Sequence, residues 1–166
     1  DGQMYFLTGG RNTDSKLYRI RYTGPKVKDG ERRMSFKANQ KMRLLRKGLG
    51  DFGKPQHRGI EAVLIAWENM AHDDRNIRYA ARMVVENQDL SLWKDRALIE
   101  TNTREAIYGL IALSRHAEPS LKGAALAKLL QLDFEEMEKE DRLAYLRAVS
   151  LCFIRLGEPT EEEAAK

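Results

Sequence analysis

Apolar and aromatic residues at the start of the chain follow the two-residue period of β-strands. Residues 3–8 are rich in aromatic side chains, and residues 16–22 alternate Tyr and Ile with Arg. Residues 9–15 between them contain two glycines together with Asn, Asp and Ser, which favour a turn. The pattern predicts a β-hairpin over residues 1–24, ended by Pro25.

This hairpin has no further strands to pair with in the sequence. An isolated hairpin is marginally stable in water, and no later segment has a strand pattern. We therefore expect it to be the end of a β domain whose other strands lie elsewhere. Four aromatic residues, Tyr5, Phe6, Tyr18 and Tyr22, would pack against those strands or against the first helix.

Residues 25–36 are polar and basic and are interpreted as a linker, after which the apolar period becomes helical. The first helical stripe consists of Ala38, Met42, Leu45 and Leu49, and glycines 48, 50 and 53 with Pro55 are expected to end that helix. Further helices are predicted near residues 60–70, 77–85, 90–100, 104–116, 119–129 and 140–156, and another begins near 158. The helix over 140–156 is predicted to be the longest, with an apolar side made of Leu143, Leu146, Val149, Phe153 and Leu156.

Two stretches of the helical part resemble each other. Asp73 to Ala80 precedes Asn102 to Gly109 by 29 residues, so that Arg75 aligns with Arg104 and Tyr79 with Tyr108. A third copy near Asp141 matches loosely. A turn with Asp, then Arg, then an Ala-rich helix resembles the HEAT-repeat pattern, in which stacked helix pairs form a superhelix. The alternative is a compact bundle without repeats.

Composition supports a folded protein. The chain has 166 residues, 42% hydrophobic and 33% charged, and a net charge of +4. Residues 1–50 carry a net charge of +9 and residues 51–166 one of −5. The single cysteine, Cys152, lies in an apolar run and is predicted to be a buried small hydrophobe. No stretch of the sequence is apolar enough for a membrane span, and no signal peptide is visible.

Hairpin and helices together resemble one known arrangement. Residues 1–11 and 15–22 look like the closing strands of a sugar-dehydrogenase-like β-propeller. Residues 72–85 and 153–157 are similar to the HEAT-like segment that follows such a propeller in large secreted proteins of planctomycetes and related bacteria. Those proteins often carry a c-type haem domain and are often described as membrane-bound dehydrogenases or haem-binding proteins.

The resemblance implies a fold and a location. It implies a mainly α chain, a HEAT-like α-α superhelix over residues 37–166 after the propeller hairpin, in a periplasmic or secreted protein. Its partner would be the adjacent propeller domain of the same polypeptide. Covalent haem attachment needs Cys-x-x-Cys-His. This chain has only Cys152, so we expect no cofactor in it, and haem c would be bound elsewhere in the parent protein.

Three residue types in this chain could carry chemistry. His57, His72 and His116 are far apart, whereas a metal site needs several converging ligands, so we expect turn or surface roles. The acidic residues between 133 and 141 are interpreted as a solvated loop rather than a general acid–base pair. Trp67 and Trp93 occur at helical spacing beside Ile and Leu and are predicted to lie in the core.

Two further patterns concern phosphate and salt bridges. Gly48 to Gly53 has the spacing of a dinucleotide-binding loop but follows a helix rather than a strand, which favours a linker. Arg75, Arg78 and Arg82 lie close to aspartates and are expected to link adjacent repeats. We therefore predict no catalytic, cofactor-binding or metal-binding residue in the chain.

The main functional alternative is a basic interaction surface. Its members are Arg32, Arg33, Lys37, Lys41, Arg43 and Lys47. Such a surface can follow phosphate groups with strong salt dependence. The sequence thus leaves two hypotheses: a non-catalytic protein-interaction or spacer module of a larger dehydrogenase-like protein, or a free-standing basic HEAT-like domain that binds nucleic acid. The second includes a DNA-glycosylase-like variant, although no matching Asp and Trp constellation is visible.

Overall fold

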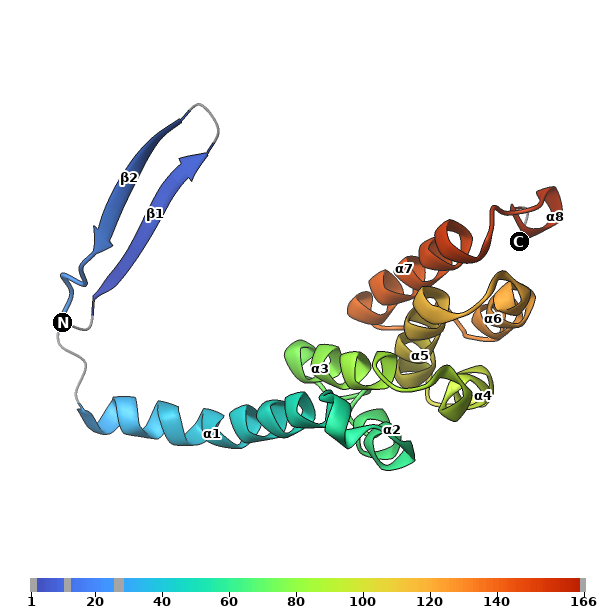
Figure 1. Cartoon of the computed structure of the whole chain (residues 1–166), viewed down its shortest axis with the longest axis horizontal. Helices are drawn as coiled ribbons and strands as arrows, with labels where there is room; N and C mark the ends of the chain where they lie inside the picture. The colour runs from blue at the N-terminus through green and yellow to red at the C-terminus, as the bar shows by residue number, and fades with distance from the viewer. Residues whose placement is uncertain (1–2, 11–12, 26–28, 165–166) are drawn as a thin grey trace. The chain divides into compact units, whose positions relative to one another are not determined.

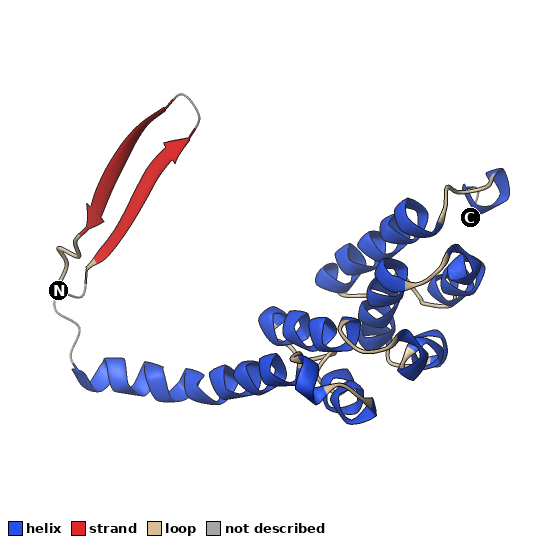
Figure 2. Ribbon diagram, in the orientation of Figure 1, coloured by secondary structure: helices blue, strands red, loops and turns tan. Residues whose placement is uncertain are grey.

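The computed structural model describes residues 3–10, 13–25 and 29–164, with only the backbone described at 13, 29–38 and 164. The chain is mainly helical, with a two-stranded hairpin near its start (Figure 2). It divides into two compact units, residues 1–39 and 40–166, and the boundary falls within the first helix. Each unit is described by itself.

The hairpin pairs β1 (Met4–Gly10) with β2 (Thr13–Ile20) in antiparallel register. The prediction of a hairpin is confirmed, but β2 begins before Lys16, because the pairing continues past Thr8 through an irregularity to Gly10 and Thr13. Arg11 and Asn12, part of the predicted turn, lie outside the described residues.

Both faces of the hairpin carry exposed apolar side chains. On one face Phe6 and Tyr18 are stacked with ring centroids 5.0 Å apart, yet both remain 43% exposed. On the other face Leu7 is opposite Leu17, and these side chains are 75% and 66% exposed. A sheet normally buries at least one such face.

Helix α1 (Asp29–Phe52) departs from the prediction at both ends. It begins at Asp29, so the linker predicted over 25–36 is wrong for residues 29–36, while 26–28 lie outside the described residues. It also continues through Gly48 and Gly50, which were expected to break it, because glycine weakens a helix by only about 1 kcal/mol per residue. At 24 residues it is longer than α7, which was predicted to be the longest helix.

Seven shorter helices follow α1 in the described residues (Figure 1). They are α2 (Ile60–Trp67), α3 (Arg75–Glu86), α4 (Lys94–Ile99), α5 (Thr103–His116), α6 (Lys122–Leu130), α7 (Lys139–Leu156) and α8 (Glu161–Ala164). Single 3-10 turns, η1 (Pro55–His57), η2 (Leu90–Leu92) and η3 (Pro119–Leu121), lie in the connections. Gly157 follows α7 with φ of 131°, a conformation that favours glycine and ends the helix there as predicted.

The helices pack in consecutive pairs. Helix α2 packs on α3, α4 on α5 and α6 on α7, while α5 contacts both α3 and α7 (Figure 1). The second helix of each pair therefore lies beside the second helix of the next. No helix within the described ranges is long and apolar enough to cross a membrane.

The core lies between these pairs. Trp67 and Trp93 are fully buried, as predicted, and Cys152 is buried too. Burial raises the pKa of the Cys152 thiol above its usual range. Gly109 of α5 permits a close approach, since a Cβ at this position would lie 3.2 Å from the Trp67 ring and 3.4 Å from Ala97 of α4.

The buried side of α7 agrees only in part with the predicted one. Of the predicted residues, Leu156 is buried and Val149 and Phe153 are half-buried, whereas Leu143 and Leu146 are 61% and 51% exposed. The other buried residues of this helix are Asp141, Ala148 and Cys152. The large leucines suggested a different side of the helix, but close helix packing selected the side with smaller residues. Exposed apolar side chains on α7 are therefore available at the surface.

Candidate functional site

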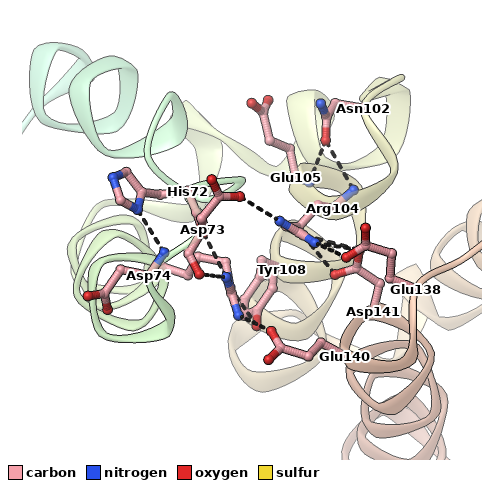
Figure 3. Close-up of polar contacts among 11 residues, drawn as sticks. His72, Asp73, Asp74, Asn102, Arg104, Glu105, Tyr108, Glu138, Glu140 and Asp141 are labelled. Atoms are coloured by element: carbon pink, nitrogen blue, oxygen red, sulfur yellow. Dashed lines mark hydrogen bonds and ion pairs between the residues drawn. The ribbon is translucent and has the colours of Figure 1, made fainter.

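Polar side chains connect α3, α5 and α7 across the helical unit (Figure 3). The elements are positioned by capped helix starts. The Asp74 carboxylate caps α3 by accepting a hydrogen bond from the backbone N–H of Asn76, and this bond lowers the pKa of Asp74. The Asn102 side chain accepts from the backbone N–H groups of Arg104 and Glu105 at 3.1 Å each, so α5 begins with its first donors satisfied.

Arg104 lies where three helix pairs meet. Its Nε donates to Oδ1 of Asp141 at 2.8 Å, and its Nη2 donates to Oδ2 at 3.0 Å, so the contact is bidentate. Nη2 also donates to Glu138 at 3.3 Å, and Nη1 lies 3.5 Å from Asp73 (Figure 3). The hydrogen bonds to Asp141 raise the pKa of Arg104 further above its usual value. The guanidinium thus joins the turn before α3 to the first turn of α7.

Arg78 makes a second connection and is only 3% exposed. Its Nη1 donates to the backbone carbonyls of His72 and Asp73 at 2.7 and 2.8 Å. Its Nε donates to the Tyr108 hydroxyl at 3.1 Å, and Nη2 to Glu140 at 3.0 Å. Every polar edge of this buried guanidinium is occupied, so its role is structural.

Of the three arginines predicted to link neighbouring helix pairs, Arg78 does so, whereas Arg82 pairs with Glu86 on its own helix and Arg75 makes no such link among the described residues. Arg104 was not among the predicted residues. Arg75 is exposed and has no ion pair within the described part of the chain. The N-cap of α3 is Asp74 and that of α5 is Asn102. When the two helices are aligned on these caps, the shift is one residue shorter than in the sequence alignment, so Arg75 and Arg104 do not occupy equivalent positions.

The acidic run 133–141 was interpreted as a solvated loop, and this is wrong for Asp141, which lies in α7, is 9% exposed and pairs with Arg104. Glu138 and Glu140 also pair with arginines, Arg104 and Arg78, but their side chains remain exposed. The carboxylates lie at the start of α7, where negative charge is favourable. One sign of this role is visible in the sequence, because these acidic residues lie at the start of a predicted helix.

Glu86 forms a separate buried cluster at the end of α3. Its side chain is 2% exposed, and it pairs with Arg82 on the same helix. Its second oxygen lies 3.1 Å from Nε of Arg115 and 3.3 Å from Nε2 of His116. Burial, together with repulsion from Arg115 and Arg147, lowers the pKa of Arg82. The single carboxylate of Glu86 therefore forms ion pairs with two arginines, Arg82 and Arg115.

Glu100 and Glu105 form a carboxylate pair beside Trp67. Glu100 accepts hydrogen bonds from the Trp67 indole at 2.8 Å and from the backbone N–H groups of Thr101 and Asn102. These bonds outweigh burial and lower the pKa of Glu100, whereas burial and the charge of Glu100 raise the pKa of Glu105. The guanidinium of Arg96 lies 4.8 Å from the Trp67 ring centroid and screens the pair.

A groove of about 690 Å³ is lined by residues of α3, α5 and α7. Its lining residues come from these three helices: Arg75, Asn76, Arg78, Tyr79, Arg82, Tyr108, Ile111, Glu140, Leu143, Ala144 and Arg147. Four of them are arginines and one is acidic. This volume is within the range of sites that hold small ligands or short segments, about 300–1,000 Å³.

The basic residues predicted as an interaction surface lie on α1. Lys41, Arg43 and Lys47 are exposed, and the side chains of Arg32, Arg33 and Lys37 lie outside the described residues. Lys41, Arg43 and Lys47 do not line the groove. Three of the four arginines that do line it, Arg75, Arg78 and Arg82, were expected to have structural roles.

The histidines remain apart. His72 accepts from the backbone N–H of Asp74 at 2.9 Å, and His57 lies edge-on to Phe52. Among the residues that the structure describes, no group of three His, Cys, Asp or Glu side chains is arranged to hold a metal ion.

Comparisons with protein-family models, with curated proteins and with solved structures find no match.

Proposed function

We propose that this chain is a non-catalytic interaction or spacer module of a larger secreted, dehydrogenase-like or haem-binding protein. In this proposal the helix pairs form a HEAT-like superhelix, and the hairpin completes the sheet of an adjacent propeller domain. Haem c would be bound in another part of the parent protein, and the module would be periplasmic or secreted. The type of parent protein in this proposal is taken from the sequence resemblance alone.

The observation that supports the proposal is the exposure of the hairpin. Leu7 and Leu17 on one face, and Phe6 and Tyr18 on the other, remain exposed among the described residues. Burial of a large apolar side chain contributes about 1.5–3 kcal/mol, so a hairpin of this composition is expected to pack inside a larger sheet. The pairing of α2 with α3, α4 with α5 and α6 with α7 is what stacked repeats require.

A truncation tests the independence of the helical unit. Removal of residues 1–24 should leave its thermal midpoint within about 1 °C, a few tenths of a kcal/mol. The Gly109→Val variant of the full chain serves as the control, because it disturbs packing against Trp67 and should lower the midpoint clearly. A comparable loss on truncation would contradict the proposal.

The genomic context tests the identity of the parent. Propeller-like repeats encoded upstream of residue 1, together with Cys-x-x-Cys-His encoded downstream, would support the proposal. A start codon directly before this region and a stop codon directly after it would contradict it.

Nucleic-acid binding is the second candidate. It is favoured by the exposure of Lys41, Arg43, Arg46 and Lys47 on α1. If α1 follows a phosphate backbone, affinity for a duplex should fall steeply between about 50 and 200 mM salt. Replacement of Lys41 and Lys47 by Gln should reduce that salt dependence. A salt-independent affinity would exclude this function.

A further inference from the structure

The groove over α3, α5 and α7 has more positive charge than its own acids neutralise. Arg75 and Arg147 line it and form no ion pair or hydrogen bond within the described ranges. Arg82 is 7% exposed and shares the single carboxylate of Glu86 with Arg115. Only Arg78 is fully compensated, by Glu140 and two backbone carbonyls.

The same groove has an apolar part. Ile111 lies at its base with 2% exposure, Ala144 is half-buried, and Leu143 on the α7 wall is 61% exposed. Tyr79 on the opposite wall is 58% exposed. A ligand that fits this lining carries both negative charge and an apolar side chain.

An acidic peptide satisfies these conditions better than a nucleic acid. A phosphate backbone carries a charge on every nucleotide and would bring some of these charges near Glu140, whose side chain is 71% exposed, whereas a peptide can place its carboxylates away from Glu140. It would also leave Leu143 uncovered. A peptide can place carboxylates on Arg75 and Arg147 and bury an apolar side chain against Leu143, which combines charge complementarity with apolar burial.

We propose that this groove binds a short acidic segment of a partner protein, with carboxylates paired to Arg75 and Arg147 and an apolar side chain packed on Leu143. All the lining residues lie in the helical unit. The inference therefore goes beyond the proposed function of the hairpin, and either can fail without the other.

Fluorescence anisotropy with the full chain tests this binding. The probes are labelled short peptides, each combining several Glu or Asp residues with one Leu, Ile or Phe, and the same peptides with Lys in place of the acids. The acidic set is expected to contain members with Kd below about 1 mM, a binding free energy near −4 kcal/mol. The basic set should not bind.

Variants locate the site. Arg147→Glu should weaken binding of the acidic peptides about tenfold, because it replaces an attraction by a repulsion. Arg155→Glu makes the same charge change at an exposed position of α7 that does not line the groove, and affinity should be unchanged. Leu143→Ser should weaken binding of peptides with an apolar residue more than that of all-acidic peptides. Thermal midpoints of all three variants verify folding.

Three results would overturn the proposal. The first is the absence of binding by every acidic peptide at about 1 mM. The second is an equal loss of affinity in Arg147→Glu and Arg155→Glu, which would indicate a general charge effect. The third is tighter binding of a labelled single-stranded oligonucleotide that Arg147→Glu abolishes, which would make the groove a nucleic-acid site.

Discussion

The contact between Arg104 and Asp141 should stabilise the helical unit by more than an ordinary surface ion pair. The two side chains are 18% and 12% exposed and form hydrogen bonds of 2.8, 3.0 and 3.1 Å. At an effective dielectric constant of about 20, unit charges about 4 Å apart attract by about 4 kcal/mol. Desolvation offsets part of that attraction, and we expect a net coupling of about 2 kcal/mol.

A double-mutant cycle measures this coupling. Arg104→Met should cost about 3 kcal/mol, because it leaves Asp141 largely buried and unpaired beside Glu138. Asp141→Asn should cost about 2 kcal/mol, since Arg104 keeps Glu138 and Asp73 as partners. The double variant should cost about 2 kcal/mol less than the sum.

Urea unfolding followed by tryptophan fluorescence provides the free energies. Both tryptophans, Trp67 and Trp93, are buried in the helical unit, so the signal reports on this unit. Lys54 and Asp51 form the matched control, because their 2.5 Å contact is shorter but the side chains are 53% and 48% exposed. Their coupling should be clearly smaller than that of Arg104 and Asp141, because solvent screens exposed charges. An equal coupling for both pairs would refute the argument from burial.

Three further changes have defined outcomes. Glu105→Gln should raise the thermal midpoint at pH 7 but not near pH 4, about the usual pKa of Glu. The raised pKa of Glu105 means that its protonated form fits the fold, and this stability is lost as pH rises and Glu105 ionises beside Glu100; a gain independent of pH would contradict the reasoning. Asn102→Ala should lower the stability of the helical unit by about 1 kcal/mol in urea unfolding, and Asn102→Asp should retain the cap. Gly109→Val should cost about 2 kcal/mol through overpacking on Trp67, whereas Gly123→Ala, with open space around it, should not destabilise; equal effects would refute the close-packing argument.

Local patterns predicted the type of most elements. The change from a two-residue to a helical period separated the hairpin from the helices, and Gly157 ended α7 as expected. The first residue of α1 was missed because polar residues and Gly30 mimic a linker, although a polar helix of 24 residues can form there. Hydrophobic periodicity reveals a helix through its apolar side, and the sequence of the first turns of α1 has only a weak apolar side.

Helix packing determined which residues are buried and paired where the hydrophobic pattern did not. The sequence ranks the leucines of α7 as its core side, but the buried residues of α7, which packs against α5, include Ala148 and Cys152, and small residues permit close approach of helices. The polar network was predicted in kind, as Asp and Arg side chains that link helices, and Arg78 was among the predicted members, but Arg104 and its acidic partners were not. Arg104 pairs with Asp141, 37 residues away, and such separations follow from helix stacking rather than from any local spacing.

The polar network also explains how the groove acquires its walls. Glu140 of α7 reaches Arg78 of α3, which fixes the first turn of α7 beside α3 and α5. Leu143 and Arg147 follow Glu140 at the i+3 and i+7 positions, so they project from the same side of α7 and line the groove opposite Tyr79 and Arg75. The arginines that hold the helices together are neutralised by the acids of α7. Arg75 at the start of α3 and Arg147 further along α7 have no ion-pair partner among the described residues, and this difference distinguishes the structural charges from the charges that remain for a ligand.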